Sequence, residues 1–188
     1  AKLAIEKGTT FPELSRSKED IALLQKRLNE QGMELKPFSI KPQPYMQHKA
    51  YPGLKVAVTY ALAYGGYGND FAPDAPTNPE RVVNIVNGAR KIQPSAFVGD
   101  ASAALKSLRD AGKDTKKEPV SLGQAAYTIA LALGYKTTPE QAPALLQQRG
   151  FLSAETLKLI DDKEKLTNGD TYMLIKDLHD GLKGGNSL

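Results

Sequence analysis

Three helix-start signals recur along the chain at nearly equal spacing. Each is a Ser or Thr followed three residues later by an acid or Gln, and they lie 44 and 46 residues apart: Thr77-Asn-Pro-Glu80, Ser121-Leu-Gly-Gln124 and Thr167-Asn-Gly-Asp170. In such a capping box the hydroxyl accepts the backbone N–H three residues on, and the later side chain bonds back to the cap residue. Repetition at this period indicates a tandem of similar helical units.

An apolar helix face follows each signal at matching positions. Counted from the Ser or Thr, the fifth, sixth and eighth residues are apolar in every copy, which is the spacing of one buried face: Val82, Val83 and Ile85; Ala126, Tyr127 and Ile129; Tyr172, Met173 and Ile175. We expect the capped helices over 79–92, over 122–133, and from 168 to about 180. Gly134 and Gly181 follow the last two as stop signals.

A further helix is expected before each capped helix. These helices are expected over 54–64, 100–111 and 139–149, and a glycine follows each one: Gly65, Gly112 and Gly150. The resulting units span about 50–93, 94–136 and 137–182. Because a unit of this size cannot bury its apolar face alone, the three copies are expected to pack around a shared core. The predicted fold is mainly α, with three tandem helix-loop-helix units in a domain over 48–188.

Residues 1–47 differ from this pattern and form a predicted separate N-terminal part. Ser17-Lys-Glu-Asp20 is similar to a capping box, and Ile21, Leu24 and Leu28 follow at helical spacing up to Gly32. This spacing predicts one amphipathic helix. Three prolines over 36–44 then favour an extended strap or linker, because proline fixes φ and removes a backbone donor.

The composition excludes several classes of function. The chain has no Cys, which removes disulfides, thiolate metal sites and cysteine nucleophiles, and its two histidines, His48 and His179, lie far apart. We therefore expect no metal and no cofactor, and no enzyme activity, since nothing positions paired carboxylates or a catalytic triad. The net charge of +4 is scattered over both signs, which does not favour nucleic acid. No apolar run is long enough to span a membrane.

Around the first capped helix the sequence resembles the S-layer homology family. Gly66-Tyr-Gly-Asn-Asp-Phe-Ala-Pro-Asp-Ala-Pro-Thr-Asn-Pro-Glu80 is similar to the central family motif, in which a GY turn, an acidic glycine loop, F-x-P and a T-R-A-E-like helix start follow one another. Glu118-Pro-Val-Ser-Leu-Gly-Gln-Ala-Ala-Tyr127 and Leu166-Thr-Asn-Gly-Asp-Thr-Tyr172 resemble the same helix start in two further modules. The resemblance covers roughly residues 50–182.

This resemblance implies three modules with pseudo-threefold symmetry and short β segments near the axis. It also implies a non-catalytic, extracytoplasmic attachment domain that binds a cell-envelope polysaccharide in grooves between modules. The family's ligand-binding Arg corresponds here to Asn78, Leu122 and Asn168, and the family's common Trp is absent. These departures leave a second hypothesis, in which the chain kept the fold and lost glycan binding. It then serves as a protein-interaction or envelope-assembly module that binds a partner through its N-terminal helix and its Tyr-rich loop.

Candidate ligand-binding residues gather around the first unit. Tyr64 and Tyr67 lie beside flexible glycines and could stack on sugar faces, although core packing would also explain them. Asn78 and Asn168 occupy family ligand positions, and Arg81 is a cation beside the first of them. Arg81 and Arg90 flank the first capped helix, and Lys116, Lys117 and Arg149 lie near the later inter-helix loops. These basic residues either form a relocated basic groove or remain solvated surface charges.

Overall fold

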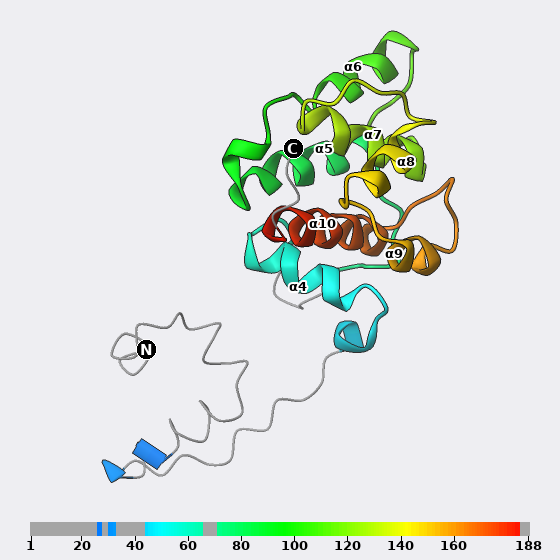
Figure 1. Cartoon of the computed structure of the whole chain (residues 1–188). Helices are drawn as coiled ribbons and strands as arrows, with labels where there is room; N and C mark the ends of the chain where they lie inside the picture. The colour runs from blue at the N-terminus through cyan, green and yellow to red at the C-terminus, as the bar shows by residue number, and fades with distance from the viewer. Residues whose placement is uncertain (1–25, 28–29, 33–43, 66–70, 185–188) are drawn as a thin grey trace. The chain divides into compact units, whose positions relative to one another are not determined.

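A computed structural model describes residues 26–27, 30–32, 44–65 and 71–184 of the chain (Figure 1). The chain divides into two compact units, residues 1–42 and 43–188. In the first unit Lys26, Arg27 and Glu30 are helical, and Gly32 has a φ of 75°. Most of the predicted N-terminal helix and of the Pro-rich strap lies outside the described residues, and the end of the strap is a 3-10 helix.

The second unit is mainly α-helical, as the sequence predicts. Within its described residues one isolated antiparallel bridge joins Pro76 to Thr167. The helices, in chain order, are η1 (Pro44–Gln47), α4 (Tyr51–Thr59), α5 (Pro79–Gly88), η3 (Ala89–Lys91), η4 (Pro94–Ala96), α6 (Ala103–Asp110), α7 (Leu122–Ala132), α8 (Ala142–Gln148), α9 (Ala154–Leu159) and α10 (Asn168–Lys183).

All three capped helices begin at the predicted residues 79, 122 and 168, and the predicted cap residue is confirmed at two of the three sites. Ser121 caps α7 by accepting from the Gln124 N–H, and Thr167 caps α10 in a complete capping box with Asp170. The prediction is wrong at Thr77, because the residue that caps α5 is Asn78, whose Oδ1 accepts from the Arg81 N–H. Pro79 occupies the first helical position of α5, where a missing N–H costs nothing, so the cap falls on the residue before it.

Several predicted helix limits also need correction. The first helix covers residues 51–59 instead of 54–64, and Gly65 does not end it. Gly181 lies inside α10, where a Cβ would stand 2.6 Å from the Gly150 carbonyl oxygen and from the Phe151 ring. This glycine therefore permits a close approach between two segments and is not a helix stop. Helix α9 was not predicted from the sequence; Ser153 caps it by accepting from the Thr156 N–H.

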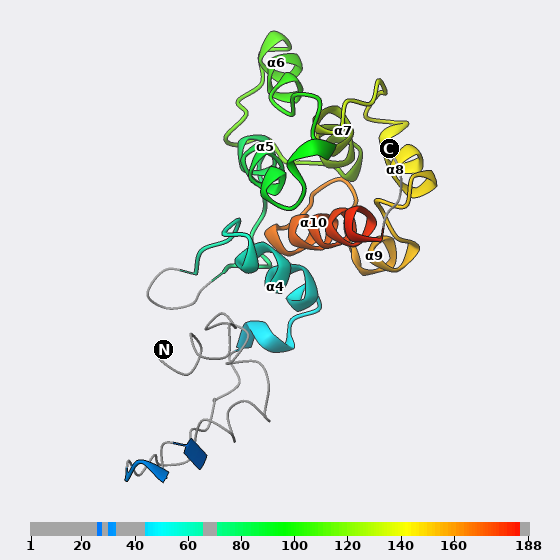
Figure 2. The same ribbon diagram turned by 60° about the vertical axis from the view of Figure 1, so that its left-hand side comes forward.

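Helix α10 lies between α4 on one side and a group formed by α5, α7 and α8 on the other (Figures 1 and 2). Its contact with α4 is the most extensive between any two helices of the described part. Gly53 makes this possible, because a Cβ there would stand 2.4 Å from the backbone of Tyr172. Helix α5 packs on α6 and α7, α7 packs on α6 and α8, and α9 contacts α10.

The apolar faces predicted behind the three caps form the core. Eight of the nine side chains at the matching positions are buried, and Tyr127 is half-buried. Ile85, Ile129 and Ile175 belong to one hydrophobic cluster, so helices from all three predicted units share a single core. The segments in front of the capped helices are also joined: the Thr77 N–H donates to the Leu166 carbonyl (3.1 Å), and the Leu166 N–H donates to the Val120 carbonyl (2.8 Å).

Candidate functional site

A groove of about 710 Å³ runs along α5. One wall is formed by the exposed side of α5 and η3, and the other by residues 61–64, which follow α4. Lys116, from the connection between α6 and α7, lies at one end. The groove is therefore built from segments of the first and second predicted units.

The α5 wall has a regular helical register. Arg81, Asn84, Gly88 and Lys91 line the groove and are three or four residues apart, which places them on one face of the helix. Asn78 fixes the start of this face, because its side chain caps the helix at the Arg81 N–H with a distance of 2.9 Å. The polar face opposite the buried Val82 and Val86 is thus turned toward the groove.

The second wall is positioned by the way α4 ends. The Leu62 N–H donates to the Ala57 carbonyl (2.7 Å) and the Ala61 N–H to the Val58 carbonyl (3.0 Å), which is the hydrogen-bond pattern of a Schellman motif. This motif needs a left-handed residue, and Ala61 supplies it with a φ of 55°. Across the groove, Gly88 lets this wall approach α5, because a Cβ there would stand 2.6 Å from Leu62 Cδ2.

The charges of the groove are predominantly positive. Arg81, Lys91 and Lys116 are exposed cations, whereas Glu80 is the acidic residue of the lining. Glu80 Oε1 accepts from the Thr115 hydroxyl (2.7 Å) and from Arg109 Nη2 (3.3 Å). The Thr115 hydrogen bond, followed by the Arg109 interaction, lowers the pKa of Glu80. Its carboxylate is therefore ionised at neutral pH and already partnered, which leaves three cations for an anionic ligand.

Two of these cations are held by groups outside the helix that carries them. Arg81 Nη2 donates to the hydroxyl of Tyr172, a side chain of α10 that is 1% exposed, at 3.0 Å. Lys91 Nζ donates to the Tyr60 carbonyl at 3.4 Å. The Tyr172 hydroxyl orients the Arg81 guanidinium through one N–H group and leaves its other N–H groups for a ligand. The planar guanidinium can bind a carboxylate or phosphate with two parallel hydrogen bonds.

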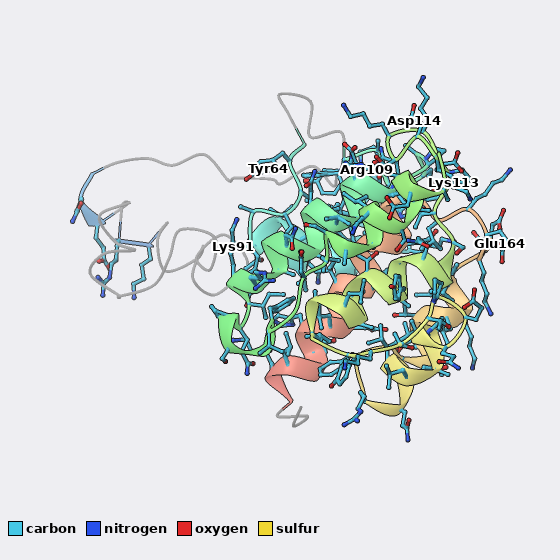
Figure 3. All side chains as sticks on the ribbon, turned by 90° about the horizontal axis from the view of Figure 1, so that it is seen from above. Tyr64, Lys91, Arg109, Lys113, Asp114 and Glu164 are labelled. Atoms are coloured by element: carbon cyan, nitrogen blue, oxygen red, sulfur yellow. The ribbon has the colours of Figure 1, made fainter. Side chains whose placement is uncertain are left out.

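An aromatic side chain stands at the edge of the groove. Tyr64 is 77% exposed although it lines the groove, and Figure 3 shows it projecting on the side of the domain where Lys91 also lies. In the same view Lys113 and Asp114 lie at another edge. An exposed phenol ring offers an apolar face for a sugar and a hydroxyl for hydrogen bonds at the rim.

Three of the five predicted binding residues meet in this groove. Tyr64, Asn78 and Arg81 all line it, and Tyr67 lies outside the described residues. Asn168 lies elsewhere: it is 3% exposed in the first turn of α10, and its Nδ2 donates to the Ala72 carbonyl at 3.0 Å.

Among the further basic residues considered from the sequence, Lys116 lines the groove, but Arg90 does not. The Arg90 guanidinium donates to the carbonyls of Phe97 (2.7 Å) and Gly99 (2.5 Å), so it holds the segment after η4. The sequence reasoning missed Lys91, which does line the groove. A spacing of ten residues from Arg81 gave no signal, because ten α-helical steps end roughly 80° away from the starting face. Lys91 returns to the groove side because the last three steps are the 3-10 helix η3, which makes one full turn.

The three positions that correspond to the family's ligand-binding Arg have different environments. Asn78 is partly exposed at the groove, whereas Leu122 is 6% exposed and Asn168 is 3% exposed. Both buried residues stand at the first position of a helix that packs closely on another segment, since a Cβ at the following Gly123 or Gly169 would meet a neighbour within 3 Å. Of these three helix starts, the start of α5 therefore borders an open groove, whereas Leu122 and Asn168 at the starts of α7 and α10 are buried.

The histidines have structural partners. His48 Nδ1 accepts from the Ala50 N–H (3.0 Å), and its Nε2 lies 2.9 Å from Asp74 Oδ1. His179 Nδ1 lies 3.0 Å from Asp180 Oδ1. Among the described residues, no group of three or more His, Cys, Asp or Glu side chains is arranged to hold a metal ion.

No helix in the described ranges has both the length and the apolar character needed to cross a membrane. A comparison of the chain with protein-family models, curated proteins and solved structures found no match.

Proposed function

We propose that this chain is a non-catalytic, extracytoplasmic attachment domain that binds an acidic cell-envelope polysaccharide in the groove along α5. The observation that carries the proposal is the combination of Arg81, Lys91 and Lys116 with the exposed Tyr64 in one groove. Cations attract the acidic groups of such a polymer, and an exposed aromatic ring packs against the apolar face of a sugar.

The packing order of the helices supports a three-unit fold of the S-layer homology type. Helix α5 contacts α6, α7 contacts α8, and α10 contacts α4. In each pair, the capped helix of one predicted unit packs on the first helix of the next, and the third unit returns to the first. This cyclic order is what pseudo-threefold symmetry requires, and the antiparallel bridge between Pro76 and Thr167 joins the segments in front of two of the capped helices.

The groove takes the place of the family's Arg-based site in this proposal. The family's Arg is replaced by Asn78, whose side chain is occupied as the cap of α5. Arg81 lies one helical turn further on, on the groove side, and Tyr172 orients it. The cation needed for an acidic sugar has thus moved by three residues along the same helix.

Co-sedimentation of the full chain with bacterial cell-wall sacculi tests the proposal. We expect binding to intact sacculi, loss of binding after chemical extraction of the attached polysaccharide, and weakening at higher salt. Replacing both Arg81 and Lys116 by Gln should abolish binding. The matched control replaces Lys106 and Lys158, two exposed lysines outside the groove, by Gln and should bind like the wild type. Equal binding before and after extraction would refute polysaccharide recognition.

A second candidate function is an envelope-assembly module that binds a protein. The observation in its favour is the exposure of three large apolar side chains, Val58 (44%), Tyr64 (77%) and Val98 (75%). This function predicts that deletion of residues 1–35 removes partner binding, whereas glycan binding in the α5 groove would survive the deletion. Retention of sacculus binding by the deletion variant would therefore count against the assembly function.

A further inference from the structure

We propose that the α5 groove binds an internal stretch of an acidic glycan and contacts two of its acidic groups at once, one at each end of α5. This inference rests on the proposed function and deepens it, because it specifies the ligand as a chain of several sugars and not a single terminal acidic sugar. It follows from the separation of the groove cations and from what lies between them.

The cations form two groups at opposite ends of one helix face. Arg81 lies in the first turn of α5, and Lys91 is the last residue of η3. Seven α-helical steps and three 3-10 steps separate these two residues, which gives a rise of about 16 Å. One acidic group cannot contact both cations when they are this far apart, unless both side chains bend toward each other.

The two side chains are held in ways that keep them apart. Arg81 is tied to Tyr172 on α10, and Lys91 is tied to the Tyr60 carbonyl at the end of α4. Lys116 joins the Arg81 end, because the neighbouring Thr115 is hydrogen-bonded to Glu80 in the first turn of α5. The groove therefore has two cations at one end and one at the other.

The middle of the groove carries no charge. Asn84, Gly88 and Leu62 line the stretch between the two ends, and they offer one amide side chain and an apolar surface. Glu80, the acidic lining residue, lies at the Arg81 end and is already engaged by Thr115 and Arg109. Along the groove, cations at each end are therefore separated by a neutral surface. This order matches a polymer in which acidic sugars are separated by neutral ones.

A ligand that reaches both ends gains affinity through effective concentration. Once the first acidic group is bound at Arg81 and Lys116, the second is held near Lys91 and binds as an intramolecular event. A short sugar acid can use one end alone. We therefore expect the affinity to rise steeply with chain length until the ligand spans the groove, and then to level off.

Hyaluronan oligosaccharides test this expectation, because they alternate a carboxylate sugar with a neutral sugar. The full chain is titrated by calorimetry, at one fixed salt concentration, with the disaccharide, the tetrasaccharide and the hexasaccharide. The affinity should rise by at least about tenfold between the disaccharide and the hexasaccharide. Lys91→Gln should lower the affinity for the hexasaccharide much more than the affinity for the disaccharide and so remove most of this gain. Lys106→Gln, the control on α6, should leave the affinity for all three lengths unchanged.

The outcomes separate this inference from the proposed function. An affinity that does not change with oligosaccharide length, or an equal loss for all lengths in Lys91→Gln, would overturn the two-ended groove while leaving single-site glycan binding intact. Failure of all three oligosaccharides to bind would overturn the two-ended groove for alternating carboxylate glycans, and the sacculus experiment would then decide on the proposed function separately. A gain with length that survives Lys91→Gln would place the second contact elsewhere and also contradict the proposal.

Discussion

Replacing Ala61 by Gly should stabilise the domain, because Ala61 is a non-glycine residue in the left-handed region. It occupies the position that follows the C-cap of α4, and its φ is 55°. The three corresponding positions after α6, α7 and α8 are Gly112, Gly134 and Gly150, all with φ between 74° and 83°. The chain therefore uses glycine at every such helix end except this one, among those four helices.

The size of the effect follows from two opposing terms. The left-handed conformation costs a non-glycine residue about 1–2 kcal/mol, and glycine loses about 0.5–1 kcal/mol more backbone entropy on folding than alanine does. The Ala61 side chain is exposed, so removal of its methyl group costs little buried surface. The net gain is about 0.5–1 kcal/mol, which corresponds to a rise in Tm of about 1–4 °C for a domain of this size.

Thermal and urea unfolding monitored by circular dichroism measure this gain. The urea midpoint should rise with an unchanged m-value, since the surface exposed on unfolding stays the same. The reciprocal variant, Gly112→Ala, is the control: φ there is 74° and a Cβ meets nothing within 4 Å, so the variant carries backbone strain alone and should lose about 1 kcal/mol. If Ala61→Gly is neutral or destabilising while Gly112→Ala is destabilised, the reasoning about the end of α4 is refuted.

Three further predictions concern the core and the groove. Ile129→Asp should unfold the second unit, because it places a charge in the cluster shared by all three capped helices, whereas Ile129→Val should cost about 1 kcal/mol; wild-type melting of the Asp variant would contradict the shared core. The lowered pKa of Glu80 means that its contribution to stability is present above the unfolded-state pKa and is lost as the pH falls through the lower folded-state value. NMR titration should show that Thr115→Val raises the Glu80 pKa toward its ordinary value, and an unchanged titration would rule out Thr115 as the main cause. Tyr172→Phe should keep the fold and weaken glycan binding by about threefold to tenfold, because Arg81 loses the hydroxyl that orients it; equal affinity in a sacculus-binding assay would contradict that role.

The capped helices and their buried faces could be predicted from the sequence because both depend on near neighbours. Ser121 and Thr167 each accept a hydrogen bond from the backbone N–H three residues later in the chain, and the buried positions repeat with the helical period. The error at Thr77 was also local: Pro79 marks the first helical position and so identifies Asn78 as the cap. The mainly α character of the domain was determined at this level.

The candidate site depends on contacts between distant parts of the chain, and only the tertiary structure decided it. Tyr64, Arg81 and Lys116 come from three segments, and no local pattern shows that they share a groove. The tertiary packing also decided that Asn168 is buried and hydrogen-bonded to the Ala72 carbonyl, whereas Asn78, in the same local motif, borders the groove. Local hydrogen bonding and periodicity thus fix where helices begin and which face is apolar. Which polar residues remain exposed together depends on how the helices pack, because packing removes the rest of the surface from solvent.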